Sequence, residues 1–168
     1  MKLQRVIKLF IPVFMMFTLL LLPSSILKAN ATTQVTQQPT TEKSPTYITS
    51  FQYVNGKWVG KFDYIQWYFG KAADKEFLKD CKCSKEMDHA PDGYWIRNVN
   101  PKIRTFTISD NAQYILQTRD LYQIKWNEKV TRNQFITFLK QQDTHHQIPY
   151  HIEVKNGVVT KITQQYIP

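Results

Sequence analysis

The chain has two cysteines, Cys81 and Cys83, separated by a single residue, and they are the first candidates for chemistry. A disulfide between them would close a tight, strained ring that is reduced more easily than an ordinary bridge. A second interpretation is a metal site with His89 as a further ligand, although zinc sites usually place about two to four residues between paired cysteines. Two thiols without a role are the third interpretation. The spacing leaves all three open.

A metal site would also need a fourth ligand, and His145, His146 or His151 are the remaining histidines. His145 and His146 are adjacent, and adjacent side chains of a strand point to opposite faces. They also precede Pro149 in a polar stretch, which favours a solvated loop pair over a metal site. We therefore predict no metal and no cofactor.

Motifs that position a catalytic group are missing from the sequence. There is no G-x-S-x-G, H-E-x-x-H, P-loop or G-x-G-x-x-G pattern. The aspartates mostly mark turns or helix ends, and no two carboxylates are singled out as the facing pair that a glycosidase requires. We therefore favour a non-enzymatic protein. The alternative is a small extracellular hydrolase or metal-dependent enzyme whose Asp, His or Cys residues meet only in the fold.

Amphipathic aromatic rings offer the best candidates for ligand binding. They are dense in Tyr64–Gly70 (YIQWYFG) and recur at Tyr94 and Trp95, close to Arg97. Trp and Tyr contribute strongly at contact surfaces. Core packing is the competing interpretation: an Arg beside exposed rings suits a carbohydrate or anionic ligand, whereas an Arg stacked on a packed ring does not. The candidate ligand-binding residues are Trp67, Tyr68, Tyr94, Trp95 and Arg97.

The first 31 residues read as a cleavable signal peptide. Lys2, Arg5 and Lys8 precede an uncharged run from Leu9 to Leu22, and Ala29-Asn30-Ala31 supplies the cleavage pattern. A membrane anchor is the alternative, but a spanning helix needs about 20 apolar residues and this run is shorter. We predict a secreted protein cleaved near Ala31, which meets the membrane only through the signal peptide. An oxidising compartment would permit the Cys81–Cys83 bridge.

Charge limits the class of partner. The formal net charge is +9, and the first 31 residues hold four bases and no acid, which leaves +5 for the remainder. No basic run of five or more residues occurs, so the footprint of a nucleic-acid binder is missing. The expected partner is a protein or an anionic envelope polymer, and no nucleic acid is expected.

Residues 32–46 are rich in Thr, Gln and Pro, and we expect a flexible leader there because they bury little apolar surface. Residues 47–168 form one β-rich domain. In its first half the alternation predicts strands at Tyr47–Val54 and Trp58–Tyr68, the second bent near Gly60. Asn55-Gly56 predicts the hairpin turn between them. A short helix is expected over Lys71–Asp80.

The second half of the domain predicts more strands and one more helix. Thr131 and Gln134 have the spacing of a capping box at the start of this helix. Asn156-Gly157 predicts a closing hairpin, in which a bulge must correct the spacing of the apolar residues. The expected strands are Tyr94–Arg97, Lys102–Ser109, Ala112–Thr118 after a turn at Asp110-Asn111, Leu121–Trp126, Tyr150–Lys155 and Val158–Tyr166.

These elements predict a mainly β (α+β) fold: a small antiparallel β-barrel or curled sheet, OB-like, with two short helices covering it. Aromatic residues are abundant enough to fill such a core, with 4 Trp, 9 Tyr and 10 Phe in the chain.

Three stretches carry a resemblance: Asp63–Phe77, Asp92–Leu116, with its run YWIRNVNPKIRTF, and Pro149–Pro168. In this order they resemble small exported proteins of Gram-positive bacteria whose function is uncharacterised. The resemblance covers most of residues 47–168, implies an exported β-rich module and supplies no catalytic residue. The Cys81-Lys82-Cys83 loop is not part of the shared pattern.

Together these observations predict a secreted, non-enzymatic binding or interaction module at the cell envelope or in the extracellular space. An extracellular enzyme is the alternative. An inhibitor of a foreign enzyme, acting through an exposed loop at Lys82–Pro91, is a third hypothesis.

Overall fold

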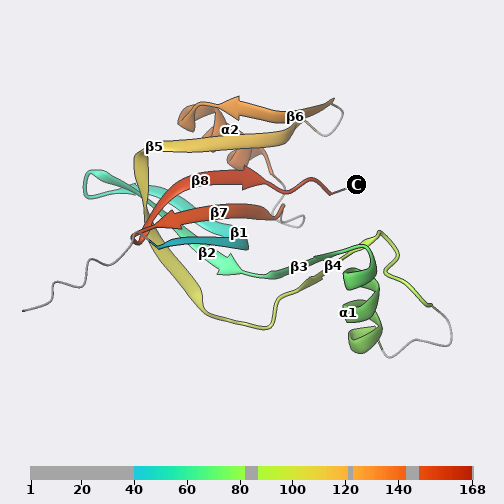
Figure 1. Cartoon of the computed structure of the whole chain (residues 1–168). Helices are drawn as coiled ribbons and strands as arrows, with labels where there is room; N and C mark the ends of the chain where they lie inside the picture. The colour runs from blue at the N-terminus through green and yellow to red at the C-terminus, as the bar shows by residue number, and fades with distance from the viewer. Residues whose placement is uncertain (1–39, 82–86, 121–122, 143–147, 168) are drawn as a thin grey trace, which may run out of the picture. The chain divides into compact units, whose positions relative to one another are not determined.

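The computed structural model describes residues 40–81, 87–120, 123–142 and 148–167, within the compact unit Gln37–Pro168 (Figure 1). Strands dominate these ranges, and two helices interrupt them. In chain order the elements are β1 (Thr41–Val54), β2 (Lys57–Tyr64), β3 (Gln66–Phe69), α1 (Lys71–Cys81), β4 (Tyr94–Arg97), β5 (Ile103–Asp120), β6 (Gln123–Val130), α2 (Arg132–Gln141), β7 (Tyr150–Lys155) and β8 (Val158–Gln164).

Five of the strands close into a barrel. The large sheet has the order β2-β1-β7-β8-β5-β6, and β2 also pairs with β5. This additional pairing joins the two ends of the run β2-β1-β7-β8-β5, while β6 continues the sheet beyond β5. The barrel has a Greek-key connection between its third and fourth strands, as in an OB fold. The OB-like barrel expected from the sequence is therefore confirmed.

The sequence predicted an antiparallel barrel, but one pair of barrel strands is parallel. β5 and β8 run parallel, with Thr107 opposite Val158 and Ile115 opposite Thr163. Parallel strands need a long connection between them. Here β6, α2 and β7 form that connection. Because β5 and β8 are far apart in the sequence, turn signals such as Asn-Gly cannot predict that they pair.

The turn expected at Asp110-Asn111 is absent, because β5 is one continuous strand through both residues. Its first half pairs with β2 and its second half with β6, and its register against β8 shifts between Ile108 and Gln113. The two polar residues therefore lie where the strand bends to follow the barrel.

The first strand begins earlier than the sequence suggested. Residues Thr41–Thr46, expected in the flexible leader, pair with β7 from Lys155 to Tyr150. The leader prediction rested on the lack of apolar side chains, but strand pairing uses the backbone, and the fully buried Thr46 also donates its hydroxyl to the carbonyl oxygen of Asp63 at 2.8 Å. Residues 32–39 lie outside the described residues.

Both Asn-Gly turns form as predicted. Asn55 and Gly56 have φ of 49° and 79°, and Asn156 and Gly157 have φ of 50° and 77°. Two successive positive φ values define the hairpin turn that matches strand twist. The bulge expected in the closing hairpin is also present, as a register shift between Glu153 and Val154 that brings Val154 opposite Val159.

The barrel interior is aromatic and aliphatic. Helix α2 packs Phe135 and Phe138 against it, and Phe135 meets the rings of Phe51, Tyr114 and Tyr150. The capping box predicted at its start is present: the Thr131 hydroxyl accepts from the backbone N–H of Gln134, whose side chain accepts from the backbone of Thr131.

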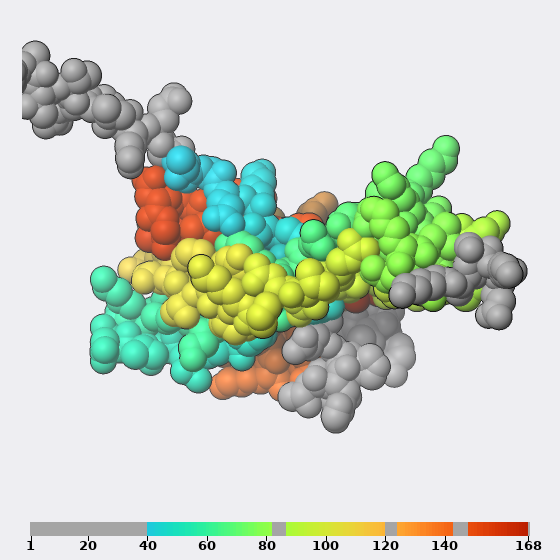
Figure 2. All heavy atoms as spheres, turned by 90° about the horizontal axis from the view of Figure 1, so that it is seen from below, coloured from blue at the N-terminus to red at the C-terminus, as the bar shows by residue number. Residues whose placement is uncertain are grey.

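A small subdomain is inserted between β2 and β5. It consists of the two-stranded sheet β3–β4 and helix α1, which packs on that sheet (Figure 1). The strand expected over residues 58–68 is interrupted at Ile65, whose backbone N–H donates to the carbonyl oxygen of Pro45. In Figure 2 the yellow residues leading from β4 into β5 run along the surface from the green α1 region to the barrel.

Candidate ligand-binding surface

The β3–β4 sheet holds all five candidate ligand-binding residues and divides them between its two faces. Tyr68 lies opposite Trp95 and Gln66 lies opposite Arg97, so these side chains share one face. Trp67 and Tyr94 belong to the other face, together with Phe69 and Ile96. The sequence put the five residues in one group because it does not show which strands pair.

The first face is occupied by helix α1. Tyr68 and Trp95 pack against a small core that contains Ala73 and Phe77 of α1, and the rings of Trp95 and Phe77 meet edge to face with centroids 5.1 Å apart. The spacing of Ala73 and Phe77, four residues apart, places both on the buried side of the helix. Tyr68 and Trp95 therefore serve in packing, which was the competing interpretation.

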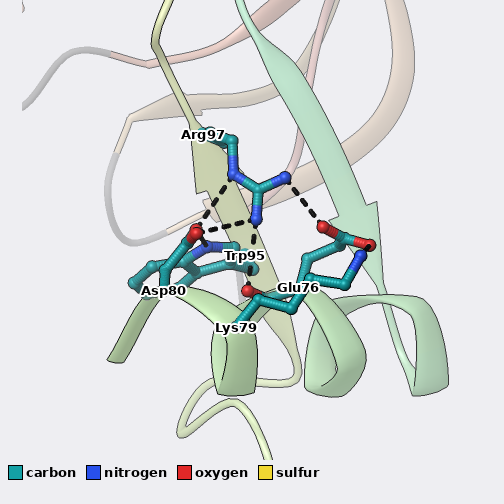
Figure 3. Close-up of polar contacts among 5 residues, drawn as sticks. All are labelled: Glu76, Lys79, Asp80, Trp95 and Arg97. Carbon is teal, nitrogen blue, oxygen red and sulfur yellow. Dashed lines mark hydrogen bonds and ion pairs between the residues drawn. The ribbon is translucent and has the colours of Figure 1, made fainter. Parts of the chain in front are cut away.

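Arg97 fastens this helix to the sheet (Figure 3). Its Nη1 lies 2.7 Å from Oε2 of Glu76, and its Nη2 lies 2.9 Å from Oδ1 of Asp80. Its Nε donates to Oδ2 of Asp80 at 3.0 Å, and the indole N–H of Trp95 donates to the same oxygen at 2.8 Å. Every nitrogen of the guanidinium has a protein partner, and the side chain is only 19% exposed.

The electrostatics of this cluster follow from its contacts. Hydrogen bonds from Lys79 and then Arg97 lower the pKa of Glu76. The hydrogen bond from Trp95, followed by those from Arg97, lowers the pKa of Asp80. The two carboxylates in turn raise the pKa of Arg97. The cluster consequently stabilises the charged forms of its own members, and the charge of Arg97 is balanced within the protein.

The opposite face, which we call the aromatic face (Trp67, Phe69, Tyr94 and Ile96), does not meet α1. The rings of Trp67 and Tyr94 are stacked, with centroids 4.8 Å apart and planes 11° apart. Both are half-buried, whereas Phe69 is 67% exposed. Three aromatic rings therefore stand together on this face, two of them ordered by their mutual stacking.

Polar groups border the aromatic face at its barrel end, and we call them the polar margin (Tyr47, Asp63 and Asn98). Asn98 follows β4 with the same alternation as Tyr94 and Ile96, and its amide nitrogen donates to Oδ2 of Asp63 at 2.6 Å. Tyr47 lies directly across from Asp63 in the β1–β2 pair. Burial raises the pKa of Tyr47, and the nearby Tyr94 and Asp63 raise it further.

The other carboxylate oxygen of Asp63, Oδ1, is enclosed and has no hydrogen-bond partner in the described part of the chain. Such an acceptor is uncommon in a folded protein and calls for a donor. Asp63 also makes no ion pair with any residue that the structure describes. The polar margin is therefore acidic, but Oδ1 itself is too enclosed for a ligand on the surface to reach it.

No basic side chain projects from the aromatic face. Arg97 is the single Lys or Arg of β3 and β4, and it belongs to the opposite face, where acids surround it. The surface formed by the aromatic face and the polar margin can thus stack against a flat, weakly polar ligand and exchange hydrogen bonds with it.

The cysteine and histidine candidates do not gather in the described residues. Cys81 is the last residue of α1 and packs at the edge of its small core, but Cys83 lies outside the described residues, so the disulfide stays a prediction. His89 Nδ1 lies 2.5 Å from Asp88 Oδ1, and His151 bonds Gln165. His145 and His146 lie outside the described residues. Across the described ranges, no three His, Cys, Asp or Glu side chains are grouped to hold a metal ion.

Two further findings bear on function. In the portion that the structure describes, no helix combines the length and apolar character needed to cross a membrane. No protein-family model, no curated protein and no solved structure matches the chain.

Sequence reasoning missed Tyr47, Asp63, Phe69 and Asn98. Period-2 alternation through Trp67 and Phe69, and through Tyr94, Ile96 and Asn98, would have placed these side chains on one face once the two segments were known to pair. Tyr47 and Asp63 come from β1 and β2, and only the barrel brings them to the same surface.

Proposed function

We propose that the chain is a secreted, non-enzymatic binding module and that the aromatic face with its polar margin is its ligand-binding surface. The carrying observation is the ordered Trp67–Tyr94 stack beside the exposed Phe69, on the side of the β3–β4 sheet that α1 leaves uncovered. Exposed, preorganised aromatic rings contribute most of the binding free energy at contact surfaces.

The position of this surface on the barrel supports the proposal. OB folds bind ligands on the outer face of their second and third strands, flanked by the loops between strands one and two and between strands four and five. Here those two loops are the tight Asn55-Gly56 and Asn156-Gly157 turns, which provide little contact area. The insertion between the second and third barrel strands, β2 and β5, supplies the aromatic surface in their place, directly after Asp63 of β2.

The proposal includes two expectations: the protein is secreted, and it does not catalyse a reaction. The signal peptide pattern of residues 1–31 supports the first, and the missing catalytic motifs support the second. Turnover of a substrate by the purified protein, abolished by one point substitution, would overturn the non-enzymatic part.

The binding surface is tested by cosedimentation of the purified protein with insoluble Gram-positive cell-wall fragments. We expect Trp67→Ala to weaken binding by at least tenfold, because it removes one half of the ring stack. Trp126→Ala is the matched control, since Trp126 is also a partly exposed Trp on a strand, at 61% exposure, but lies on β6. Equal binding by the two variants, or no binding by the unsubstituted protein, would contradict the proposal.

A further inference from the structure

The charge of the proposed binding surface differs from that of the chain as a whole. The chain is basic, with a formal net charge of +9, of which +5 remains beyond residue 31. The aromatic face has no base, and its polar margin has the carboxylate of Asp63, which makes no ion pair with any described residue. A polyanion would therefore approach an acidic group and no base on the aromatic face itself, although the alternation of β2 places Lys61 on the same side of that strand as Asp63.

This arrangement argues against two ligand classes that the fold and the net charge would otherwise suggest. Single-stranded nucleic acids bind where stacking rings line a positively charged groove. Anionic polymers likewise depend on ion pairs that neutralise their charges. The stacking element is present on this surface, but none of the four residues of the aromatic face is a base, so a ligand that stacks without bringing negative charge fits it best.

The unused hydrogen-bonding groups narrow the class further. Among the described residues, Oδ2 of Asp63 accepts one hydrogen bond, from Asn98, and the hydroxyls of Tyr47 and Tyr94 make no hydrogen bond. A ligand that supplies donors as well as acceptors satisfies all of them, and phosphate or carboxylate groups supply acceptors alone. Sugar hydroxyls are both donor and acceptor, and the C–H face of a pyranose ring is an apolar surface that packs against an aromatic ring.

The geometry points to an uncharged sugar chain as the ligand of the aromatic face, an inference that rests on the binding function proposed above. Pyranose rings would stack on Trp67, Tyr94 and Phe69, and their hydroxyls would bond Asp63, Asn98 and Tyr47. From Tyr94 to Asn98 the strand direction spans about 13 Å, which is longer than one pyranose ring. An oligosaccharide is therefore expected to bind more tightly than its monosaccharide.

The test measures binding of chitohexaose and of poly-γ-glutamate to the purified protein by titration calorimetry at two salt concentrations. We expect chitohexaose to bind with little dependence on salt and to compete with cell-wall fragments, and we expect N-acetylglucosamine to bind at least tenfold more weakly. Asp63→Asn should weaken chitohexaose binding by about threefold or more, and Trp126→Ala should leave it unchanged. Trp67→Ala should weaken it at least tenfold; because this variant could unfold the small sheet, Phe69→Ala, at an exposed position, serves as the second variant.

Three outcomes would overturn the inference. Binding of poly-γ-glutamate that salt abolishes and Asp63→Asn strengthens would replace the sugar with a polyanion. Cosedimentation that depends on Trp67 without any chitohexaose binding would remove the sugar class and leave the binding function intact. Cosedimentation that does not depend on Trp67 would remove both.

Discussion

Single residues decide which aromatic rings are free to bind. In the sequence, Arg97 beside Trp95 and Tyr94 resembles the cationic part of a ligand site. In the structure its guanidinium is held by Glu76 and Asp80, and Trp95 shares Asp80 with it. The identities of these residues are visible in the sequence, but their partners are on a helix 15 or more positions away, so the role of Arg97 emerges only from the fold.

The Arg97 cluster predicts a pH dependence. Glu76 and Asp80 have folded pKa values lowered from 4.5 and 3.8, so their stabilising effect is present at neutral pH. This stabilisation is lost as the pH falls from the ordinary pKa values to below the lowered pKa values of the folded protein. Over that range the two carboxylates bind protons in the unfolded chain before they do so in the folded one. We expect the melting temperature to fall over this acidic range, and Arg97→Gln to make the fall shallower.

Thermal melts between pH 7 and pH 2.5 measure this effect. Arg119→Gln is the matched control, because Arg119 is a half-exposed arginine that pairs with Glu128 on a different part of the molecule. It should keep the slope of the unsubstituted protein. Parallel curves for the protein and Arg97→Gln would show that the cluster does not contribute.

The turn glycine Gly157 carries a second prediction. Its φ of 77° lies in the region that β-branched residues resist, and a Cβ there would meet no neighbouring atom within 4 Å. Backbone strain is therefore the main cost, and Gly157→Val should lower the free energy of unfolding by about 1 kcal/mol or more. Gly157→Asn should cost less, because Asn tolerates positive φ. Equal losses in urea melts would contradict this explanation.

Among the elements, the ones with local signals could be predicted from the sequence. Both Asn-Gly hairpins, the α1 helix and the capping box of α2 depend on residues within a few positions of one another. The elements that could not be predicted depend on distant partners: the parallel β5–β8 pair, the uninterrupted β5, and the polar start of β1 at Thr41.

Helix α2 offers a direct test of the capping box. Thr131→Ala removes the acceptor for the backbone N–H of Gln134 and should destabilise the protein by about 1 kcal/mol. Thr137→Ala is the matched control on the same helix, where the hydroxyl bonds the backbone oxygen of Asn133 and stays exposed. It should change stability by no more than about 0.5 kcal/mol. Similar losses for both variants in a denaturant melt would contradict a specific role for the cap.

At the scale of the whole molecule, the barrel and the inserted subdomain have different tasks. The barrel buries the main core and fixes the orientation of β2 and β5, between which the subdomain is inserted. Within the subdomain, α1 covers one face of the β3–β4 sheet and leaves the aromatic face uncovered. Composition predicted a β-rich fold with abundant aromatic residues, but the division of those residues between core and surface requires the strand pairing.

The most direct test of the aromatic face as the ligand-binding surface is a fluorine NMR spectrum of the protein labelled with 5-fluorotryptophan, recorded with and without soluble cell-wall glycan. The chain has four tryptophans, Trp58, Trp67, Trp95 and Trp126, so each resonance can be assigned by substitution. If the aromatic face binds glycan, the Trp67 resonance should shift most and the Trp126 resonance should stay unchanged. A shift confined to Trp126, or no shift of Trp67 when the glycan is bound, would contradict binding at this face.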